Sequence, residues 1–465
     1  MKLFIKNVAC TAAASAFASI AFAAVSPEEA KQLGGPVLTI FGAERAGNKD
    51  GSIPTFPGEG GERVKTPASF DPNEPLHVPN AFPDEKPLFS ITAQNMDKYA
   101  DKMSDAQKAL LKTYPGYHMD IYPTHRTALY PKSMLDNTLK NATACKGSEG
   151  ELALVGCYAG VMFPIPKTGS QVVWNHITPY VGYAWSIDSK SFYVTPDGKP
   201  VLQGELAIHQ EFPIYQEKTP RVLDADDVYY RLRYDTLGPA RKVGEKVVFS
   251  YPMDPIKGAR IYQYIPGQRR VKLAPDLAYD TPTPQSGGVS TMDENRIFFG
   301  AQDRYDMKML GKKEIFMLYN SYNTYDYKKC PEEVFFRKGF INPDCLRWEL
   351  HRAWVVEAKL KPGNRHIYPR RVMYFDEDTW AVGVGDNYDS SGKLYRGDFV
   401  GHYQNYAPGG SQLDNVFFPT YTADFQTGAY YVSVFTAYPG GGIKSEQPKP
   451  QTYYSPEALS GQGIR

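Results

Sequence analysis

The stretch from about residue 180 to residue 438 constrains the fold most, because it repeats the pattern of paired β-strands. It is rich in Tyr, Val, Phe and Trp, and turn signals such as Asp197-Gly198 and Pro266-Gly267 interrupt its apolar runs. Apolar and polar residues that alternate between such turns are typical of β-hairpins. We count about eleven strands, and an antiparallel sheet of that size tends to curl. The sequence therefore predicts a mainly β chain built on a large curved antiparallel sheet.

The strand predicted over residues 347–360 shows the alternation most clearly. Its apolar residues fall on one face and charged residues fall on the other, with Arg352 as the one interruption. The residues predicted to share the apolar face are Trp348, Leu350, Trp354, Val356, Ala358 and Leu360. Further strands are expected over residues 365–375, 380–388, 393–406, 415–423 and 429–438. Because the turns between them are too short for crossover helices, we expect these strands to be antiparallel neighbours.

The chain before residue 180 has a different character. Residues 34–88 are dense in Pro, Gly and Asn, which predicts an irregular strap over the folded body, anchored by apolar residues such as Phe56. A short helix is expected from Thr92, and capping boxes that begin at Ser104 and Thr168 predict two more. We divide the chain into a leader (1–24), the strap and short helices (25–179) and the β domain (180–465), the last two packed as one compact unit.

The first 24 residues are typical of a cleavable signal peptide. Two lysines precede an apolar run over residues 8–22, and small residues follow it, so cleavage is expected near Ala23 or Ala24. Cys10 lies inside the apolar run rather than directly after it, which argues against a lipid anchor. No later stretch approaches the roughly 20 apolar residues that a membrane-spanning helix needs. The sequence predicts an exported protein that does not span the membrane.

Four cysteines remain after the leader. Export to an oxidising compartment favours disulfides, and the order along the chain suggests that Cys145 pairs with Cys157 and Cys330 with Cys345. The sequence alone leaves three pairings open. Cysteine ligation of a metal is disfavoured, because there is no Cys-x-x-Cys spacing and no histidine beside either pair.

Charge and motifs argue against nucleic-acid binding and against catalysis. The 52 Lys and Arg residues nearly balance the 51 Asp and Glu residues, and no basic cluster is visible. The sequence has no nucleophile elbow, zinc-protease motif, phosphate-binding loop or dinucleotide fingerprint. Histidines such as His351 and His366 are interpreted as structural, with metal ligation as the alternative. We therefore predict no enzyme activity, no cofactor and no metal.

Aromatic residues are the strongest remaining signal. The chain has 34 Tyr, 24 Phe and 5 Trp residues, which together make 14% of it. A curved sheet with aromatic residues on its concave face can enclose a cavity for an apolar ligand, whereas ordinary core packing is the alternative. The candidates for lining such a cavity are Trp174, Trp348, Leu350, Trp354, Val356, Trp380 and Val382.

Several short motifs carry a resemblance to a known family. They are Phe163-Pro164-Ile165-Pro166-Lys167, Trp174-Asn175-His176, Gly267-Gln268-Arg269-Arg270-Val271, Leu277-Ala278-Tyr279-Asp280-Thr281-Pro282, Asp303-Arg304-Tyr305-Asp306 and Tyr374-Phe375-Asp376-Glu377-Asp378-Thr379-Trp380. With them the chain resembles a Gram-negative family known as domain of unknown function 1329. That family is similar to the periplasmic lipoprotein carrier and the outer-membrane receptor of the Lol sorting pathway. The C-terminal half resembles their open half-barrel with a helical lid.

The resemblance implies a periplasmic carrier that binds a lipid or a lipoprotein acyl chain without catalysis or cofactor. It also implies cooperation with an inner-membrane transporter of the resistance-nodulation-division type or with an outer-membrane protein. Two alternatives stay open. The chain is a structural or assembly partner that docks through its Pro/Gly-rich strap, or it is an envelope hydrolase.

Overall fold

One large sheet dominates the molecule. The computed structural model describes residues 25–216, 219–274, 279–406 and 415–461, so the predicted signal peptide lies outside the described residues. The strands of the sheet are β1 (Phe89–Ile91), β2 (Met119–Ile121), β5 (Ala184–Val194), β6 (Pro200–Glu211), β7 (Val228–Gly238), β8 (Lys246–Pro252), β9 (Arg260–Ile265), β10 (Arg270–Leu273), β11 (Tyr305–Leu318), β14 (Trp348–Leu360), β15 (Arg370–Asp376), β16 (Val382–Tyr388), β17 (Leu394–Gln404), β18 (Asn415–Asp424), β19 (Tyr430–Phe435) and β20 (Gly442–Ser445). Two short hairpins lie outside it, β3 (Lys146–Ser148) with β4 (Ala153–Val155) and β12 (Phe336–Arg337) with β13 (Phe340–Ile341).

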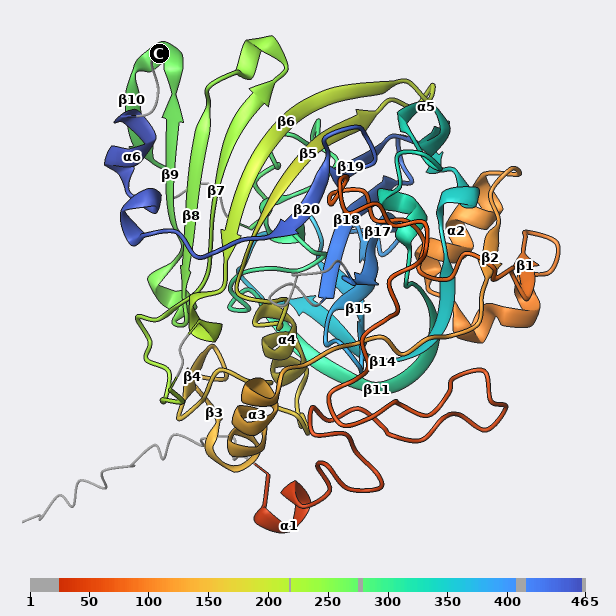
Figure 1. Ribbon diagram of the computed structural model, residues 1–465, viewed down its shortest axis with the longest axis vertical. Helices are drawn as coiled ribbons and strands as arrows, with labels where there is room; N and C mark the ends of the chain where they lie inside the picture. Colours follow the sequence, from red (N-terminus) through yellow and green to blue (C-terminus); the bar gives the residue numbers. More distant parts are fainter. Residues whose placement is uncertain (1–24, 217–218, 275–278, 407–414, 462–465) are drawn as a thin grey trace, which may run out of the picture.

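The 16 strands of the sheet follow the order β1-β2-β14-β15-β16-β17-β18-β19-β5-β6-β7-β8-β9-β10, while β11 pairs with β14 and β20 with β5. In Figure 1 the sheet curves and stays open. All pairs are antiparallel except β2 with β14, which are parallel. The predicted class is confirmed, although the sheet has more strands than the eleven expected.

The strands predicted after residue 360 occur as β15 to β19, and each pairs antiparallel with the next. The sheet then continues from β19 to β5, where Val432 lies opposite Phe192. The last strands of the chain therefore lie beside the first long strand of the domain. In addition, β1 and β2 join the edge of this sheet, so residues before 180 contribute strands to it.

Among the described residues, six α-helices accompany the sheet. They are α1 (Pro27–Ala30), α2 (Asp105–Thr113), α3 (Lys132–Ala144), α4 (Gly169–Ile177), α5 (Glu332–Phe335) and α6 (Pro456–Gly461). Ser104 and Thr168 cap α2 and α4 as predicted, whereas the helix expected from Thr92 is a 3₁₀ helix that begins at Met96. None of the helices in the described ranges is long and apolar enough to cross a bilayer.

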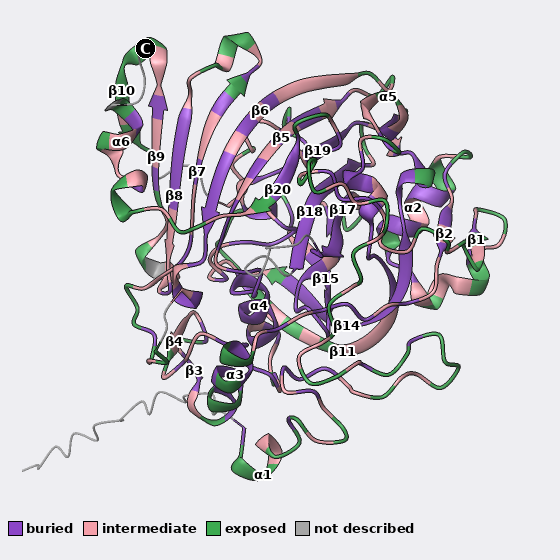
Figure 2. Cartoon of the chain, in the orientation of Figure 1, coloured by how far each residue is buried: buried purple, intermediate pink, exposed green. Residues whose placement is uncertain are grey.

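Helix α4 lies inside the curve of the sheet (Figure 1). It packs on β11 and β14, and its residues share one apolar cluster with strands from both halves of the sheet, such as Ile208 of β6 and Phe375 of β15. Figure 2 shows α4 as a buried helix, in contrast to the exposed α1. Gly169 permits this close packing, because a β-carbon there would lie 2.6 Å from the carbonyl oxygen of Met307.

The described part of the connection from β10 to β11 crosses the interior of the molecule (Figure 1). β10 lies at one end of the sheet, whereas β11 pairs with β14 near the other end. We call its described part from residue 279 to residue 304 the crossing segment. Its residues Ile297, Phe298 and Phe299 belong to the same apolar cluster as α4. The crossing segment therefore covers the inner side of the sheet together with α4.

The predicted strap is an ordered, irregular segment. Phe41 and Phe56 are buried and contact each other edge to face, and the indole N–H of Trp380 donates to the carbonyl oxygen of Phe41 at 2.9 Å. Both predicted disulfides, Cys145–Cys157 and Cys330–Cys345, are present.

Candidate ligand cavity

The larger of two adjoining cavities lies between the crossing segment and one end of the sheet. Its volume is about 390 Å³. Its lining residues are Tyr229, Tyr251, Pro252, Pro255, Lys257, Gly258, Ala259, Arg260, Ile261, Leu273, Tyr279, Met292, Asp293, Phe299, Gly300 and Ala301. Carbon-rich side chains form most of the wall, and Lys257 and Arg260 are the cationic residues in it. Pockets for small molecules occupy roughly 300–1,000 Å³, so this cavity falls within the usual range.

A second cavity, of about 150 Å³, lies beside the first. Tyr230, Leu232 and Phe249 of β7 and β8 form one side, while the crossing segment and residues of β18 and β19 form the others. Tyr251 and Met292 line both cavities. These two side chains therefore stand between the cavities.

An aromatic cluster forms the wall where the cavities meet. The pairing of β7 with β8 shifts register between Val228 and Tyr230, and Tyr229 and Tyr230, although adjacent in sequence, both pack on Phe299. The ring centroid of Tyr251 lies 4.9 Å from that of Phe299. Such an irregularity changes the direction of side chains along a strand. Burial raises the pKa of Tyr230 to about 12, so the phenol stays neutral at physiological pH.

Arg296 lies behind this aromatic wall. Its guanidinium carbon is 4.8 Å from the ring centroid of Phe299 and 5.8 Å from that of Tyr230, and only 3% of the residue is exposed. Among the described residues no carboxylate forms an ion pair with it, and its Nη2 atom is buried without a hydrogen bond. Burial removes water from the guanidinium group and thereby lowers the pKa of Arg296. A positive charge without a counter-ion thus lies next to an apolar cavity.

Asp293 fixes the crossing segment to the opposite half of the sheet. Its carboxylate accepts from Nε2 of His366 at 3.0 Å, from Nη1 of Arg371 at 3.2 Å and from the hydroxyl of Thr291 at 2.7 Å. Burial alone would raise the pKa of Asp293, but Arg371 and His366 lower it to about 2. Arg371 also donates to the carbonyl oxygen of Ile297. Charged hydrogen bonds therefore hold this part of the cavity wall in place.

The seven residues predicted to line a cavity lie elsewhere. Six of them are buried, Trp354 is partly buried, and none of the seven lines either large cavity. Trp348 and Leu350 pack in a cluster with Phe399, whereas Trp174, Trp354, Val356, Trp380 and Val382 belong to the cluster around α4. The six residues predicted to share one face of β14 are thus divided between two clusters. Val382 lines a void of only about 10 Å³.

Core packing explains these positions, because both sides of β14 are covered. Trp354 stacks on Trp380 with centroids 6.4 Å apart, and the indole N–H of Trp174 donates to the carbonyl oxygen of Glu151 at 2.7 Å. Their role as ligand contacts stays a prediction. The tyrosines at positions 229, 230 and 251 were not predicted, although they lie in the aromatic-rich tract.

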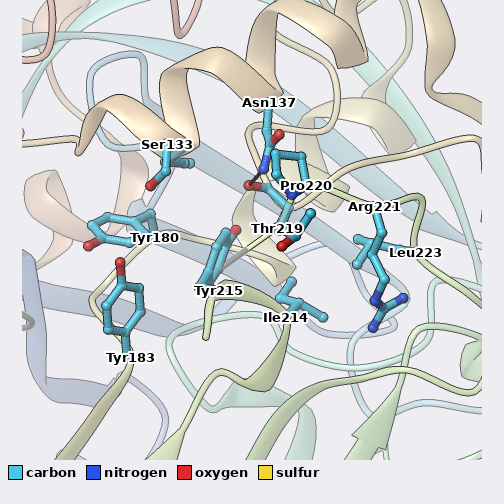
Figure 3. A pocket seen from close by; sticks show the side chains of 12 residues that line it. Ser133, Asn137, Tyr180, Tyr183, Ile214, Tyr215, Thr219, Pro220, Arg221 and Leu223 are labelled. Carbon is cyan, nitrogen blue, oxygen red and sulfur yellow. Dashed lines mark hydrogen bonds between the residues drawn. The ribbon is translucent and has the colours of Figure 1, made fainter. Parts of the chain in front are cut away.

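A third pocket, shown in Figure 3, lies between α3 and the chain around Ile214 and Pro220. Three tyrosines line it, Tyr180, Tyr183 and Tyr215, and the last donates from its hydroxyl to the carbonyl oxygen of Thr178 at 2.7 Å. Its volume of about 40 Å³ suits a few water molecules rather than an extended ligand. We therefore take the two larger cavities as the candidate site.

Fold and cavities define a mainly β protein with an apolar site beneath its crossing segment. The chain belongs to the DUF1329 family, described as proteins of unknown function, whose model matches residues 90–460. An uncharacterized protein of Pseudomonas aeruginosa is 39% identical over 391 residues, which are 83% of either chain.

Solved structures with a similar chain path include three bacterial proteins. The crystal structure of a DUF1329 family protein from Desulfovibrio piger is 13% identical, with a TM-score of 0.39, and covers 60% of this chain and 92% of its own. A putative outer membrane lipoprotein-sorting protein domain from Vibrio parahaemolyticus is 12% identical, with a TM-score of 0.38 and coverage of 59% and 91%. A LolA superfamily protein from Nitrosomonas europaea is 9% identical, with a TM-score of 0.33 and coverage of 62% and 98%.

Proposed function

We propose that this protein binds and carries a lipidic molecule in the two adjoining cavities between β7, β8 and the crossing segment. The observation that carries this proposal is the larger cavity, whose volume of about 390 Å³ is bounded mainly by aromatic and apolar residues, which are Tyr, Phe, Ile, Leu, Met, Pro and Ala. Burying an acyl chain against such a wall gains about 0.8 kcal/mol for each methylene group. The role proposed is binding without chemical change of the ligand.

The charges around the cavities favour a ligand with an acidic group. Arg260 lies in the lining of the larger cavity, and Arg296 lies buried behind its aromatic wall without a carboxylate partner among the described residues. The other two charged residues of this lining are already paired, Lys257 with Asp226 and Asp293 with Arg371. A buried cation without a counter-ion is costly, and an anionic ligand nearby reduces that cost. A fatty acid or another acidic lipid combines the two properties that these walls favour.

Extraction of the purified protein with organic solvent, followed by mass spectrometry, tests the proposal. We expect an acidic lipid near one molecule per chain, recovered from protein that was expressed in a bacterial envelope. A fluorescent fatty-acid probe should bind to the delipidated protein and be displaced by the same lipid. If no lipid is recovered and the probe does not bind, the proposal is wrong.

The proposed carrier acts in the periplasm after removal of a signal peptide within residues 1–24. In this role it receives or delivers its lipid through an inner-membrane transporter of the resistance-nodulation-division type or an outer-membrane protein. Cross-linking in intact cells, followed by purification of the protein, tests this part. A stoichiometric protein partner without any bound lipid would instead favour the structural or assembly role.

A further inference from the structure

A second group of buried polar residues lies where β14 and β15 meet the strap, away from the cavities. Four carboxylates are nearly inaccessible to solvent there, those of Glu349, Asp376, Glu377 and Asp378. Three of them have a cationic partner. Arg347 contacts Glu349 at 2.6 Å, Arg352 contacts Glu377 at 2.7 Å, and Arg126 contacts Asp378 at 2.6 Å.

Asp376 differs from the other three, because no lysine or arginine of the described chain forms an ion pair with it. Its Oδ2 atom accepts from the backbone N–H of Thr379 at 2.9 Å, from the hydroxyl of Thr379 at 2.7 Å and from the hydroxyl of Tyr319 at 3.3 Å. Its Oδ1 atom is buried without any hydrogen bond. A buried carboxylate oxygen with no donor and no counter-ion is expensive, so this atom calls for a partner.

His351 presents its free nitrogen to this oxygen. Nε2 of His351 lies 3.3 Å from a carboxylate oxygen of Glu349, which favours the tautomer with the proton on Nε2. Nδ1 then has a lone pair, and it lies 3.7 Å from Oδ1 of Asp376. Two acceptor atoms thus face each other across a distance that no direct hydrogen bond spans. A cation between them would satisfy both.

Asp378 completes a set of three ligand atoms. One atom each from His351, Asp376 and Asp378 lies within 4.8 Å of the other two, and all three residues are buried. We propose that His351, Asp376 and Asp378 bind a divalent transition-metal ion such as Zn²⁺. Imidazole and carboxylate ligands are those that Zn²⁺ accepts, and a carboxylate on the second imidazole nitrogen, here Glu349, is the usual support of a ligating histidine.

The surroundings also provide room for a water molecule. A void of about 10 Å³ is lined by Asp376 and His402, and both ring nitrogens of His402 are buried without a hydrogen bond. The ring of Tyr319 lies 3.8 Å from that of His351 and 4.1 Å from that of His402. Such a void holds about one water, which can accompany the ion.

The proposed ion would be structural. Asp376 ends β15, Asp378 lies in the turn that follows, and His351 lies in β14. Arg126, the partner of Asp378, also donates to the strap carbonyl of Glu44 at 2.8 Å. The ion would thereby join two strands, a turn and, through Arg126, the strap.

Refolding with Co²⁺ tests the proposal, because a site this deeply buried takes up its ion during folding. The protein is unfolded in guanidinium chloride with a chelator under non-reducing conditions, then refolded with or without Co²⁺. We expect one Co²⁺ per chain by elemental mass spectrometry, together with visible absorption of protein-bound Co²⁺. Wild-type protein that refolds without retaining Co²⁺ would overturn the proposal.

Two variants locate the ion. Asp376→Asn removes the charge that lacks a partner, and His351→Gln removes the imidazole; each should retain the circular dichroism spectrum and lower bound Co²⁺ about tenfold or more. Asp120→Asn is the matched control, because Asp120 belongs to a half-exposed group with His118 and Asp344. Co²⁺ retained in Asp376→Asn, or lost in Asp120→Asn, would place the ion elsewhere and overturn the proposal.

Discussion

Nε2 of His176 donates a hydrogen bond of 2.9 Å to the carbonyl oxygen of Phe298, and this bond fastens α4 to the crossing segment. Nδ1 of the same ring accepts from the backbone N–H of Val382 in β16 at 3.1 Å. One neutral imidazole therefore joins the inner helix, the sheet and the segment that covers the cavities. His176 is only 1% exposed, so protonation of its ring is disfavoured.

This linkage predicts loss of stability on mild acidification. Burial, with a contribution from Arg296, lowers the pKa of His176 from 6.5 to about 3. Because the unfolded chain binds a proton below pH 6.5 and the folded chain does not, stability falls as pH decreases from 6.5 towards 3. We expect His176 to contribute about 2 kcal/mol less stability at pH 5 than at pH 7. Urea unfolding of wild type and His176→Gln at both pH values measures this; an equal pH dependence would contradict it.

Asp293 should affect the stability of the fold at a lower pH than His176 does. Its pKa is lowered from 3.8 to about 2, so its stabilising contribution is present above pH 3.8 and is lost as pH falls through 2. We expect Asp293→Asn to lower the free energy of unfolding by about 2 kcal/mol or more at pH 7 and by much less near pH 2. Denaturant titrations at a series of pH values check this. A loss that does not depend on pH would show that the charge is not responsible.

The packing of α4 on β11 predicts that Gly169→Ala is destabilising. The added β-carbon would lie 2.6 Å from the carbonyl oxygen of Met307, which backbone movement must relieve. Overpacking of this kind costs about 1–3 kcal/mol. Gly267→Ala is the matched control, because no atom lies within 4 Å of the new β-carbon there. In thermal unfolding we expect Gly169→Ala to have a lower Tm than wild type and Gly267→Ala to match wild type. Equal Tm values of the two variants would contradict the proposed contact.

The disulfide Cys330–Cys345 should contribute measurably to stability. Its cysteines are 15 residues apart, and closing a loop of that length in the unfolded chain is worth about 3 kcal/mol. We expect the double variant Cys330→Ser/Cys345→Ser to have a free energy of unfolding that is lower by about that amount, and therefore to unfold at a lower denaturant concentration. Reduction of the wild-type protein should produce a larger loss, because it also opens Cys145–Cys157, and an unchanged midpoint in the double variant would contradict the prediction.

Local features of the fold were predictable from the sequence because they depend on neighbours along the chain. The hairpins from β14 to β19, the caps at Ser104 and Thr168 and both cysteine pairs are examples. The pairing of β19 with β5 was not, since alternation shows that a strand is half-buried but not which distant strand lies beside it.

The site was harder to predict for a related reason. A tryptophan such as Trp348 shows the same alternation whether it lines a cavity or packs in a core, and both sides of β14 turned out to be covered. The cavities instead depend on the crossing segment, which has to span the sheet because β10 and β11 lie at opposite ends of it. The tyrosines at 229, 230 and 251 pack on Phe299, which lies far from them in the sequence, and alternation along a strand does not show such a contact.

The most direct test of the proposed carrier is to fill its larger cavity. Ala301 lines that cavity, whereas Ala93 is exposed beside β1, so Ala301→Trp and Ala93→Trp form a matched pair. Titration of the delipidated proteins with a fluorescent fatty-acid probe measures the dissociation constant of each. We expect Ala301→Trp to weaken binding about tenfold or more, which corresponds to at least 1.4 kcal/mol, and Ala93→Trp to match wild type. Equal affinities of the two variants would contradict the account.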